Sequence, residues 1–159
     1  MDATYTSSNM ITDLLPHKAP WLLVDEVIRV EIGAMITTKM TLPRDNIFVC
    51  SHFGGTPPLV PGVLLIEFVA QSAHLLALIS AQTSGGGLQK RPPLLARCKS
   101  SFTAPAYAED EIVAIVRLSN KSMGVYVHEA IVSVREKQVC RIEIFAGTAP
   151  DEFGYGVAP

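Results

Sequence analysis

Charged residues are scarce in this chain, and patterns typical of nucleic-acid-binding, secreted and zinc proteins are missing from the sequence. Charged side chains make up 18% of the 159 residues and the net charge is −2, so no bulk basicity indicates nucleic acid. The three cysteines form no CxxC pair, which argues against a zinc site or a disulfide framework and favours a reducing cytoplasm. Residues 1–9 lack the basic and apolar regions of a secretory signal peptide. We therefore expect one cytoplasmic domain over residues 1–159.

Hydrophobic residues are abundant instead, at 48%, which suggests a buried subunit interface. The longest apolar run is Val63–Ile79, and it carries Glu67, Gln71 and His74. A run of this length with three polar side chains is too short and too polar to span a membrane. We interpret it as the buried central helix of a globular domain and expect no membrane association.

The remaining segments predict strands on both sides of this helix. Pro61 suits the first helical turn, where its missing N–H costs nothing, and the glycines 85–87 should end the helix after about Gln82. Val139–Gly147 alternates apolar and polar residues as a half-buried strand does. The other predicted strands are Leu22–Glu31, Ala34–Leu42, Leu94–Phe102, Ile112–Leu118 and Val125–Arg135. This order predicts an α+β fold, with one antiparallel sheet on a single helix, a core over about 14–147 and a tail at 148–159.

Glu67 is the most informative residue, because a carboxylate inside an apolar run is costly unless something pairs or neutralises it. At about 100° per residue, Gln71 and His74 fall within about 40° of Glu67, so a thin polar stripe runs along the helix. Bulky apolar neighbours of Glu67 favour a functional role for it. We interpret Gln71 as its structural partner, and His74 as part of an exposed face or as a satisfied core histidine.

A second candidate group lies upstream of the helix. His52 precedes Glu67 by fifteen positions and could complete an acid/base pair in an apolar pocket. Because Pro61 has no N–H, Gly62 and Val63 supply the first free backbone donors at the positive end of the helix dipole. Gly62 has no side chain, so a ligand carbonyl can approach closely. The helix start is therefore a candidate oxyanion site.

Several motifs together resemble the signature of the (3R)-3-hydroxyacyl-acyl-carrier-protein dehydratases, the FabZ-like family of the hotdog superfamily. They are Leu15–Asp25, Ser51–Phe53, Pro61–Gln71, Lys99–Pro105 and Val139–Glu143. The resemblance runs from about Leu14 to Gly147. It implies a long helix wrapped by an antiparallel sheet, and a homodimer or trimer of dimers in which the histidine of one subunit meets the carboxylate of the other. It also implies chemistry without a metal or other cofactor.

Carried over by position, the family mechanism assigns a role to each matching residue. His52 corresponds to the base that removes a proton from C2. Glu67 corresponds to the acid, kept neutral by apolar surroundings, that protonates the departing 3-hydroxyl. The N–H of Gly62 faces the thioester carbonyl, and the products are a trans-2-enoyl thioester and water. The predicted substrate-binding residues are Phe53, Gly62, Val63 and Gln71.

The resemblance further implies that the substrate arrives on acyl carrier protein, as a thioester of its 4′-phosphopantetheine arm. Since that carrier is acidic in the family, a basic patch should dock it. The candidate docking residues are Lys90, Arg91, Arg97 and Lys99. The acyl chain is expected in an apolar tunnel between subunits, with Phe68 and Leu64 as candidate walls.

The chain departs from the family pattern around the histidine. Ser51 replaces a glycine, Gly54 replaces a proline, and the spacer through Gly54–Pro58 is one residue longer. These departures suggest a specialised pathway, such as polyketide or polyene synthesis, and they leave two alternatives open. One is a non-catalytic or half-active hotdog subunit that binds acyl carrier protein in a heterodimer with a paralogue. The other is a hotdog acyl thioesterase.

Three further residues are not expected to take part in catalysis, and one further reaction is disfavoured. His17 is predicted to be structural and His128 to be packed or exposed. Cys50 is predicted to be a buried or spectator cysteine, because no sequence feature indicates a reactive thiolate. Double-bond isomerisation is disfavoured because FabA-like relatives usually place Asp at the position of Glu67. Acyl chain length is left open.

Overall fold

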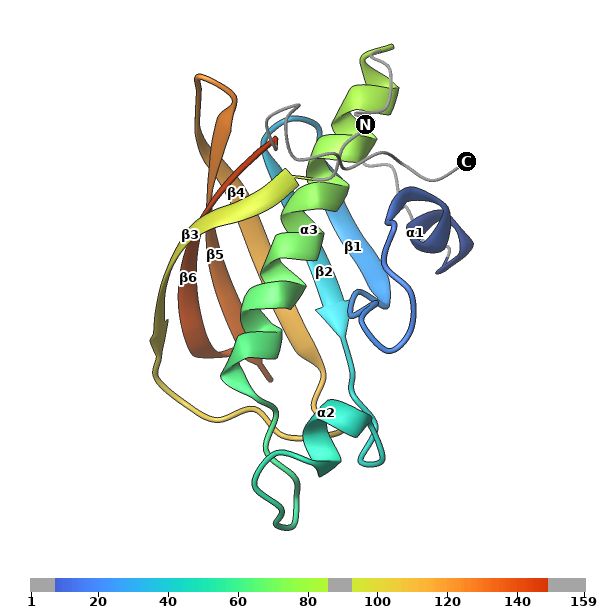
Figure 1. Cartoon of the computed structure of the whole chain (residues 1–159), viewed down its shortest axis with the longest axis vertical. Coiled ribbons are helices and arrows are strands. Elements are labelled where there is room, and N and C mark those ends of the chain that lie inside the picture. Colours follow the sequence, from blue (N-terminus) through green and yellow to red (C-terminus); the bar gives the residue numbers. More distant parts are fainter. Residues whose placement is uncertain (1–7, 86–92, 149–159) are drawn as a thin grey trace.

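One long helix, α3 (Gly62–Thr83), lies across an antiparallel sheet in the computed structural model, which describes residues 8–85 and 93–148 (Figure 1). Within these ranges six strands form the sheet, in the order β1-β2-β4-β5-β6-β3. The strands are β1 (Glu26–Glu31), β2 (Met35–Met40), β3 (Pro93–Phe102), β4 (Ile112–Ser122), β5 (Val125–Val134) and β6 (Lys137–Thr148). The predicted α+β architecture is confirmed, and each predicted strand is found with shifted ends.

Two short helices complete the described part of the chain, and neither was predicted. They are α1 (Ser8–Leu14) and α2 (Ile47–Cys50), and α2 lies near the start of α3 (Figure 1). One or two turns are too short to show a helical period in the sequence. A local signal for α2 does exist, because the side chain of Asn46 caps the helix by accepting a hydrogen bond from the Phe48 N–H at 3.0 Å.

The ends of α3 match the expectation closely, with one difference. Pro61 has φ −57° and ψ 130°, so it is the N-cap and precedes the helix instead of lying in its first turn. At the other end, Ser84 is the C-cap and its N–H bonds to the Ser80 carbonyl at 3.1 Å. Gly85 then takes a positive φ of 68°, which glycine adopts without strain. Gly86 and Gly87 lie outside the described residues.

The core forms where α3 meets the inner face of the sheet. Phe68 is completely buried there, and the predicted alternation of β6 is confirmed because Cys140, Ile142 and Ile144 are at most 1% exposed. Burial raises the pKa of the Cys140 thiol to about 11, which makes it an inert packing residue. By length and composition α3 could cross a membrane, but 67% of its most apolar window is buried inside the molecule. That burial is typical of a core helix.

Strand β3 forms one edge of the sheet and bends around the helix (Figure 1). On one side it pairs with β6, from Pro93 opposite Thr148 to Phe102 opposite Cys140, with a register shift between Leu95 and Arg97. Its apolar side chains are poorly covered in the single chain, since Leu94, Leu95 and Phe102 are 40%, 49% and 48% exposed. A long edge strand with exposed apolar residues is a ready surface for pairing with another chain.

Candidate active site

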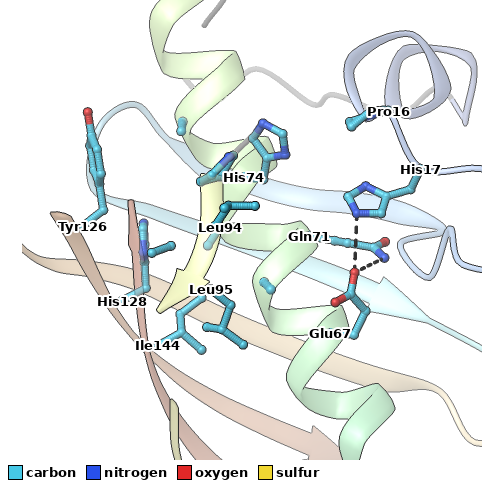
Figure 2. A pocket seen from close by; sticks show the side chains of 15 residues that line it. Pro16, His17, Glu67, Gln71, His74, Leu94, Leu95, Tyr126, His128 and Ile144 are labelled. Atoms are coloured by element: carbon cyan, nitrogen blue, oxygen red, sulfur yellow. Dashed lines mark hydrogen bonds and ion pairs between the residues drawn. The ribbon is translucent and has the colours of Figure 1, made fainter. Parts of the chain in front are cut away.

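A pocket of about 330 Å³ lies between α3 and the part of the sheet formed by β3, β5 and β6 (Figure 2). The segment before β1 closes one side of it. Its lining residues come from all of these elements: Pro16, His17, Glu67, Ala70, Gln71, Ala73, His74, Ala77, Pro93, Leu94, Leu95, Tyr126, His128, Ile144 and Ala146. The wall is largely apolar, with one carboxyl, one amide, one phenol and three imidazoles. Phe68 and Leu64, the candidate tunnel walls, belong to the core instead.

Glu67 lies in this pocket, but its surroundings are more polar than predicted. Its side chain is 32% exposed in the single chain. The carboxyl Oε1 accepts a hydrogen bond from Gln71 Nε2 at 2.9 Å and lies 3.4 Å from His17 Nε2 (Figure 2). The expectation of purely apolar surroundings is therefore wrong, because two polar partners fix the position of one carboxyl oxygen.

Gln71 links the helix to the segment before β1. It is 1% exposed, and its Oε1 accepts a hydrogen bond from the Leu23 N–H at 2.9 Å. Its Nε2 donates to the Trp21 carbonyl at 2.6 Å as well as to Glu67. The interpretation of Gln71 as a structural partner of Glu67 is confirmed. Its assignment to substrate binding stays a prediction, because both ends of the amide are already engaged within the chain.

His17 is the residue of this cluster that the sequence interpretation missed. It lies fifty positions before Glu67, and its Nδ1 is buried without a hydrogen-bond partner among residues 8–85 and 93–148. The hydrogen bonds of Gln71 to Trp21 and Leu23 carry the whole segment, and with it His17, to the helix. The one available signal was the resemblance of Leu15–Asp25 to a family motif, which marks the segment without stating its contact.

His74 and His128 also line the pocket, and both are buried. His74 is 7% exposed, so the interpretation of an exposed helical face is wrong, and His128 is 4% exposed. Burial lowers the pKa of His128 to about 4. Burial also lowers the pKa of His74 to about 4, with a smaller contribution from the nearby His17. Both imidazoles are therefore neutral at neutral pH.

His52 lies apart from this pocket. It follows α2, donates its N–H to the Val49 carbonyl at 3.3 Å, and places its ring 3.8 Å from that of Phe53. Its Nδ1 is buried without a partner in the described part of the chain, whereas Phe53 is 79% exposed. No hydrogen bond or ion pair among the described residues joins His52 to Glu67. One chain thus does not bring the two predicted catalytic groups together.

The start of α3 leaves little room for a side chain at residue 62. A Cβ on Gly62 would lie 3.0 Å from Cε1 of Phe102, whose ring packs over the helix start. Gly62 and Val63 are the first two helical residues, and no carbonyl of the same helix can reach N–H groups at these positions. Val63 is 70% exposed. The backbone donors are available as predicted, while their role as an oxyanion site stays a prediction.

The predicted docking cations are only partly described. Lys90 and Arg91 lie outside the described residues. Lys99 on β3 forms an ion pair with Glu143 at 2.7 Å, and Arg97 lies 5.4 Å from the centre of the Phe145 ring. The two cations are thus neighbours on the face of β3 that points away from α3. Their role in docking a carrier stays a prediction.

Comparison with known sequences points to one kind of enzyme. The model of the ApeP-like family, described as ApeP dehydratase, matches residues 9–153. The 3-hydroxyacyl-[acyl-carrier-protein] dehydratase FabZ of Paracidovorax citrulli (strain AAC00-1) is 30% identical over 136 residues, 86% of this chain and 92% of the relative. FabZ of Wolbachia sp. subsp. Drosophila simulans (strain wRi) is 30% identical over 137 residues, with the same coverage.

Solved structures agree on the fold. The dehydratase heterocomplex ApeI:P from Xenorhabdus doucetiae aligns with a TM-score of 0.73 at 18% identity, over 89% of this chain and 92% of that one. The zebrafish thioesterase superfamily member 2 aligns with a TM-score of 0.65 at 10% identity, over 89% and 95%. The hotdog fold is confirmed. Because dehydratases and thioesterases share it, the fold alone does not choose between the two reactions.

Proposed function

The chain belongs to the ApeP-like dehydratase family, and on that premise we propose that it removes water from a (3R)-3-hydroxyacyl thioester of acyl carrier protein. The product is the trans-2-enoyl thioester. The observation that carries the proposal is the position of Glu67. A carboxyl on the central helix lines a largely apolar pocket, where a hydrogen bond from Gln71 and the nearby His17 hold it.

In this proposal Glu67 gives a proton to the departing 3-hydroxyl group. A general acid must lie within hydrogen-bond reach of the group that it protonates, so its carboxyl needs a fixed direction. Gln71 and His17 both contact Oε1, which leaves Oε2 free of them and, in this proposal, available to the substrate. His17 and Gln71 are accordingly positioning residues, and Glu67 is the catalytic one.

His52 is the proposed base that removes the proton from C2, and it acts on the pocket of a second subunit. Two observations support this arrangement. His52 and Glu67 do not contact one another within the chain, and the edge strand β3 exposes apolar side chains. Pairing of β3 with the same strand of a partner would cover that edge and extend the sheet. We therefore propose a homodimer, or a trimer of such dimers, as the working unit.

The backbone N–H groups at the start of α3 are the proposed contact for the thioester carbonyl. Gly62 and Val63 supply them at the positive end of the helix dipole. As the C2 proton leaves, negative charge grows on the carbonyl oxygen, and fixed donors stabilise it without reorganisation. The phosphopantetheine arm would enter near this point, with Arg97 and Lys99 facing the acidic carrier protein in the cytoplasm.

The test is a dehydration assay with purified protein and a panel of 3-hydroxyacyl carrier-protein thioesters, read by mass spectrometry of the carrier-bound products. We expect loss of one water from the bound acyl group. Glu67→Gln should abolish this loss, whereas Thr56→Ala in the exposed loop should retain it. Release of free carrier thiol without an enoyl product would replace the proposal with thioester hydrolysis. The same panel gives the acyl chain length and tests the specialised-pathway interpretation.

A second candidate is the role of one subunit in a heterodimer with a paralogue. One structural neighbour is described as a dehydratase heterocomplex, and the loop that follows His52 is exposed and longer than the family pattern. The chain purified alone separates the two candidates. Robust dehydration by the homogeneous protein excludes a purely accessory role, whereas activity that appears only with a paralogue supports it.

A further inference from the structure

Two buried imidazoles face the pocket from different elements, and the proposed reaction uses neither of them. His74 comes from α3 and His128 from β5, and they are 7% and 4% exposed. Among residues 8–85 and 93–148, Nδ1 of His128 is fully enclosed and has no hydrogen-bond partner, whereas no ring nitrogen of His74 is in that state. Figure 2 shows His128 on the sheet side of the pocket and His74 on the helix side.

Packing alone does not account for this pair. A buried polar group without a hydrogen bond is destabilising, and an aliphatic side chain would fill the same wall without that cost. The neighbours of His128 in register are Ile144 on β6 and Leu118 on β4. Leucine at position 128 would continue this apolar surface. An unpartnered, enclosed nitrogen on His128 and a second imidazole, His74, in the wall of the same cavity instead indicate a hydrogen-bonding group that enters from outside.

The chemistry of the pair limits what that group can be. Burial keeps both imidazoles neutral at neutral pH, so each ring offers one N–H donor and one nitrogen acceptor. Neutral rings suit an uncharged hydroxyl or carbonyl oxygen better than a carboxylate or phosphate, which a cation would hold. Within the described ranges, no three side chains of the metal-ligating types lie close enough together to bind a metal ion.

The position of His74 relates this group to the reacting carbon. His74 lies seven residues after Glu67, which is about two turns, on the same face and roughly 10 Å further along the helix axis. A thioester whose C3 hydroxyl is at Glu67 would run its acyl chain along the helix toward His74. The polar group would therefore belong to the distal part of the acyl chain, away from the thioester.

We propose that His74 and His128 form a subsite that binds a neutral oxygen on the distal part of the acyl chain, and so select substrates that carry one. The substrate class becomes a 3-hydroxyacyl thioester with a second hydroxyl or carbonyl group remote from C3. This inference rests on the proposed function for the identity of the ligand as an acyl chain. The unpartnered Nδ1 of His128, in a cavity whose wall also holds His74, is the observation that carries it.

The direct test compares two matched probes, a saturated medium-chain acyl pantetheine and its analogue with a terminal hydroxyl. Calorimetry gives the two affinities, and ¹⁵N NMR of labelled histidine gives the imidazole shifts. We expect the hydroxylated probe to bind wild-type protein about 3- to 10-fold more tightly, the range of one net hydrogen bond. It should also shift the ¹⁵N signals of His74 and His128, whereas the plain probe should leave them nearly unchanged.

Variants assign the preference to the two residues. His128→Leu and His74→Leu should each reduce the preference, and the double variant should remove it while binding the plain probe at least as well. His128→Asn, which keeps a hydrogen-bonding group, should recover part of it. Ile131→Leu is the matched control, because it lies on the same strand and is 40% exposed on the outer face.

The outcomes separate this inference from the proposed function. Equal affinity for both probes, with no imidazole shift on adding the hydroxylated one, overturns the subsite and indicates that water alone satisfies the rings. An equal loss of affinity for both probes in the leucine variants also overturns the subsite. A clear preference in a protein without dehydratase activity retains the subsite and rejects the reaction. Dehydration without any preference for the hydroxylated probe rejects the subsite and retains the proposed reaction.

Discussion

The two groups proposed to move protons, Glu67 and His52, are held in very different ways. Glu67 extends from the middle of the central helix, and its carboxyl is hydrogen-bonded to Gln71 and lies near His17. His52 follows a single-turn helix, and the exposed segment after it contains Gly54 and Gly55 at positive φ. Among the residues that the structure describes, its ring contact is with the neighbouring Phe53.

This difference indicates which half of the site one chain can build alone. The carboxyl half is preorganised by contacts between segments far apart in the sequence, so it needs no partner. The histidine half has few contacts that fix its direction, and it does not reach Glu67 of its own chain. A second subunit would supply both the missing contacts and the missing pocket. Four measurements test this contrast.

Replacing the two proton-transfer groups should give the largest effect. Glu67→Gln and His52→Ala should each lower the dehydration rate by about 10²–10⁴-fold, the usual contribution of a general acid or base. If the halves come from different subunits, exchange of subunits between the two inactive variants restores one intact site per mixed dimer. An equimolar mixture should then recover about a quarter of wild-type activity, since half of the dimers are mixed and each keeps one of two sites. No recovery after verified exchange would falsify the shared site.

Acid should weaken the fold through the two buried pocket histidines, His74 and His128. The pKa of His74 and of His128 is about 4 in the fold, against 6.5 for an exposed histidine. The unfolded chain therefore binds protons first, so the free energy of unfolding is highest above pH 6.5 and falls as the pH drops toward 4. Each group contributes on the order of 3 kcal/mol to this fall.

Denaturant unfolding at a series of pH values, at fixed protein concentration, measures that dependence. The double variant His74→Leu and His128→Leu should flatten it between pH 6.5 and 4, while Thr56→Ala in the loop after His52, which changes no titratable group, should leave it unchanged. An unchanged slope in the double variant would show that other groups cause the acid sensitivity.

Gln71 should matter for stability far more than the loop does. Gln71→Leu leaves the Leu23 N–H and the Trp21 carbonyl without their partner, which costs about 1–3 kcal/mol for a buried group. It also frees the Glu67 carboxyl, so turnover should fall more than substrate affinity. Thr56→Ala is the loop counterpart and should change the free energy of unfolding by less than about 0.5 kcal/mol. Similar costs for the two variants would contradict the contrast.

The smallest effect is expected where the two regions meet, at the start of α3. Gly62→Ala places a methyl group 3.0 Å from the ring of Phe102, and such overpacking costs at least about 1 kcal/mol. Alanine is a better helix former than glycine by nearly the same free energy, so the net destabilisation should be small. In a Phe102→Ala background the clash is gone, and the same substitution should become stabilising. If Gly62→Ala lowers the melting temperature in the Phe102→Ala background as well, this account of Gly62 is contradicted.

The contrast also explains which parts of the fold and of the site could be predicted from the sequence. The helix and strands follow from apolar periodicity, which depends on near neighbours in the chain, and only their ends moved. The α1 and α2 helices are too short for that signal. Glu67 stood out because its neighbours in sequence are apolar, and Gln71 because it lies one turn away on the same helix.

Contacts between distant segments carry no such local signal. His17 reaches Glu67 only because Gln71 binds the backbone of Trp21 and Leu23, and no pattern around His17 indicates this. For His74 the sequence left open an exposed face or a core position, because polar stripes on helices usually face water. Its burial depends on the packing of α3 against strands that come later in the sequence, which a helical wheel cannot show.

The position of β3 has a consequence for how the chain is made. Ribosomal synthesis delivers β3 before β4, β5 and β6, yet its pairing partner in the described sheet is β6, the last of the four. Until β6 emerges, β3 has no strand to pair with, and its exposed leucines are open to other chains. The pocket is also incomplete until β6 emerges, because β3 and β6 form part of its wall. Nascent chains that stall before Lys137 should therefore depend on chaperones and be sensitive to proteases, however well α3 has already formed.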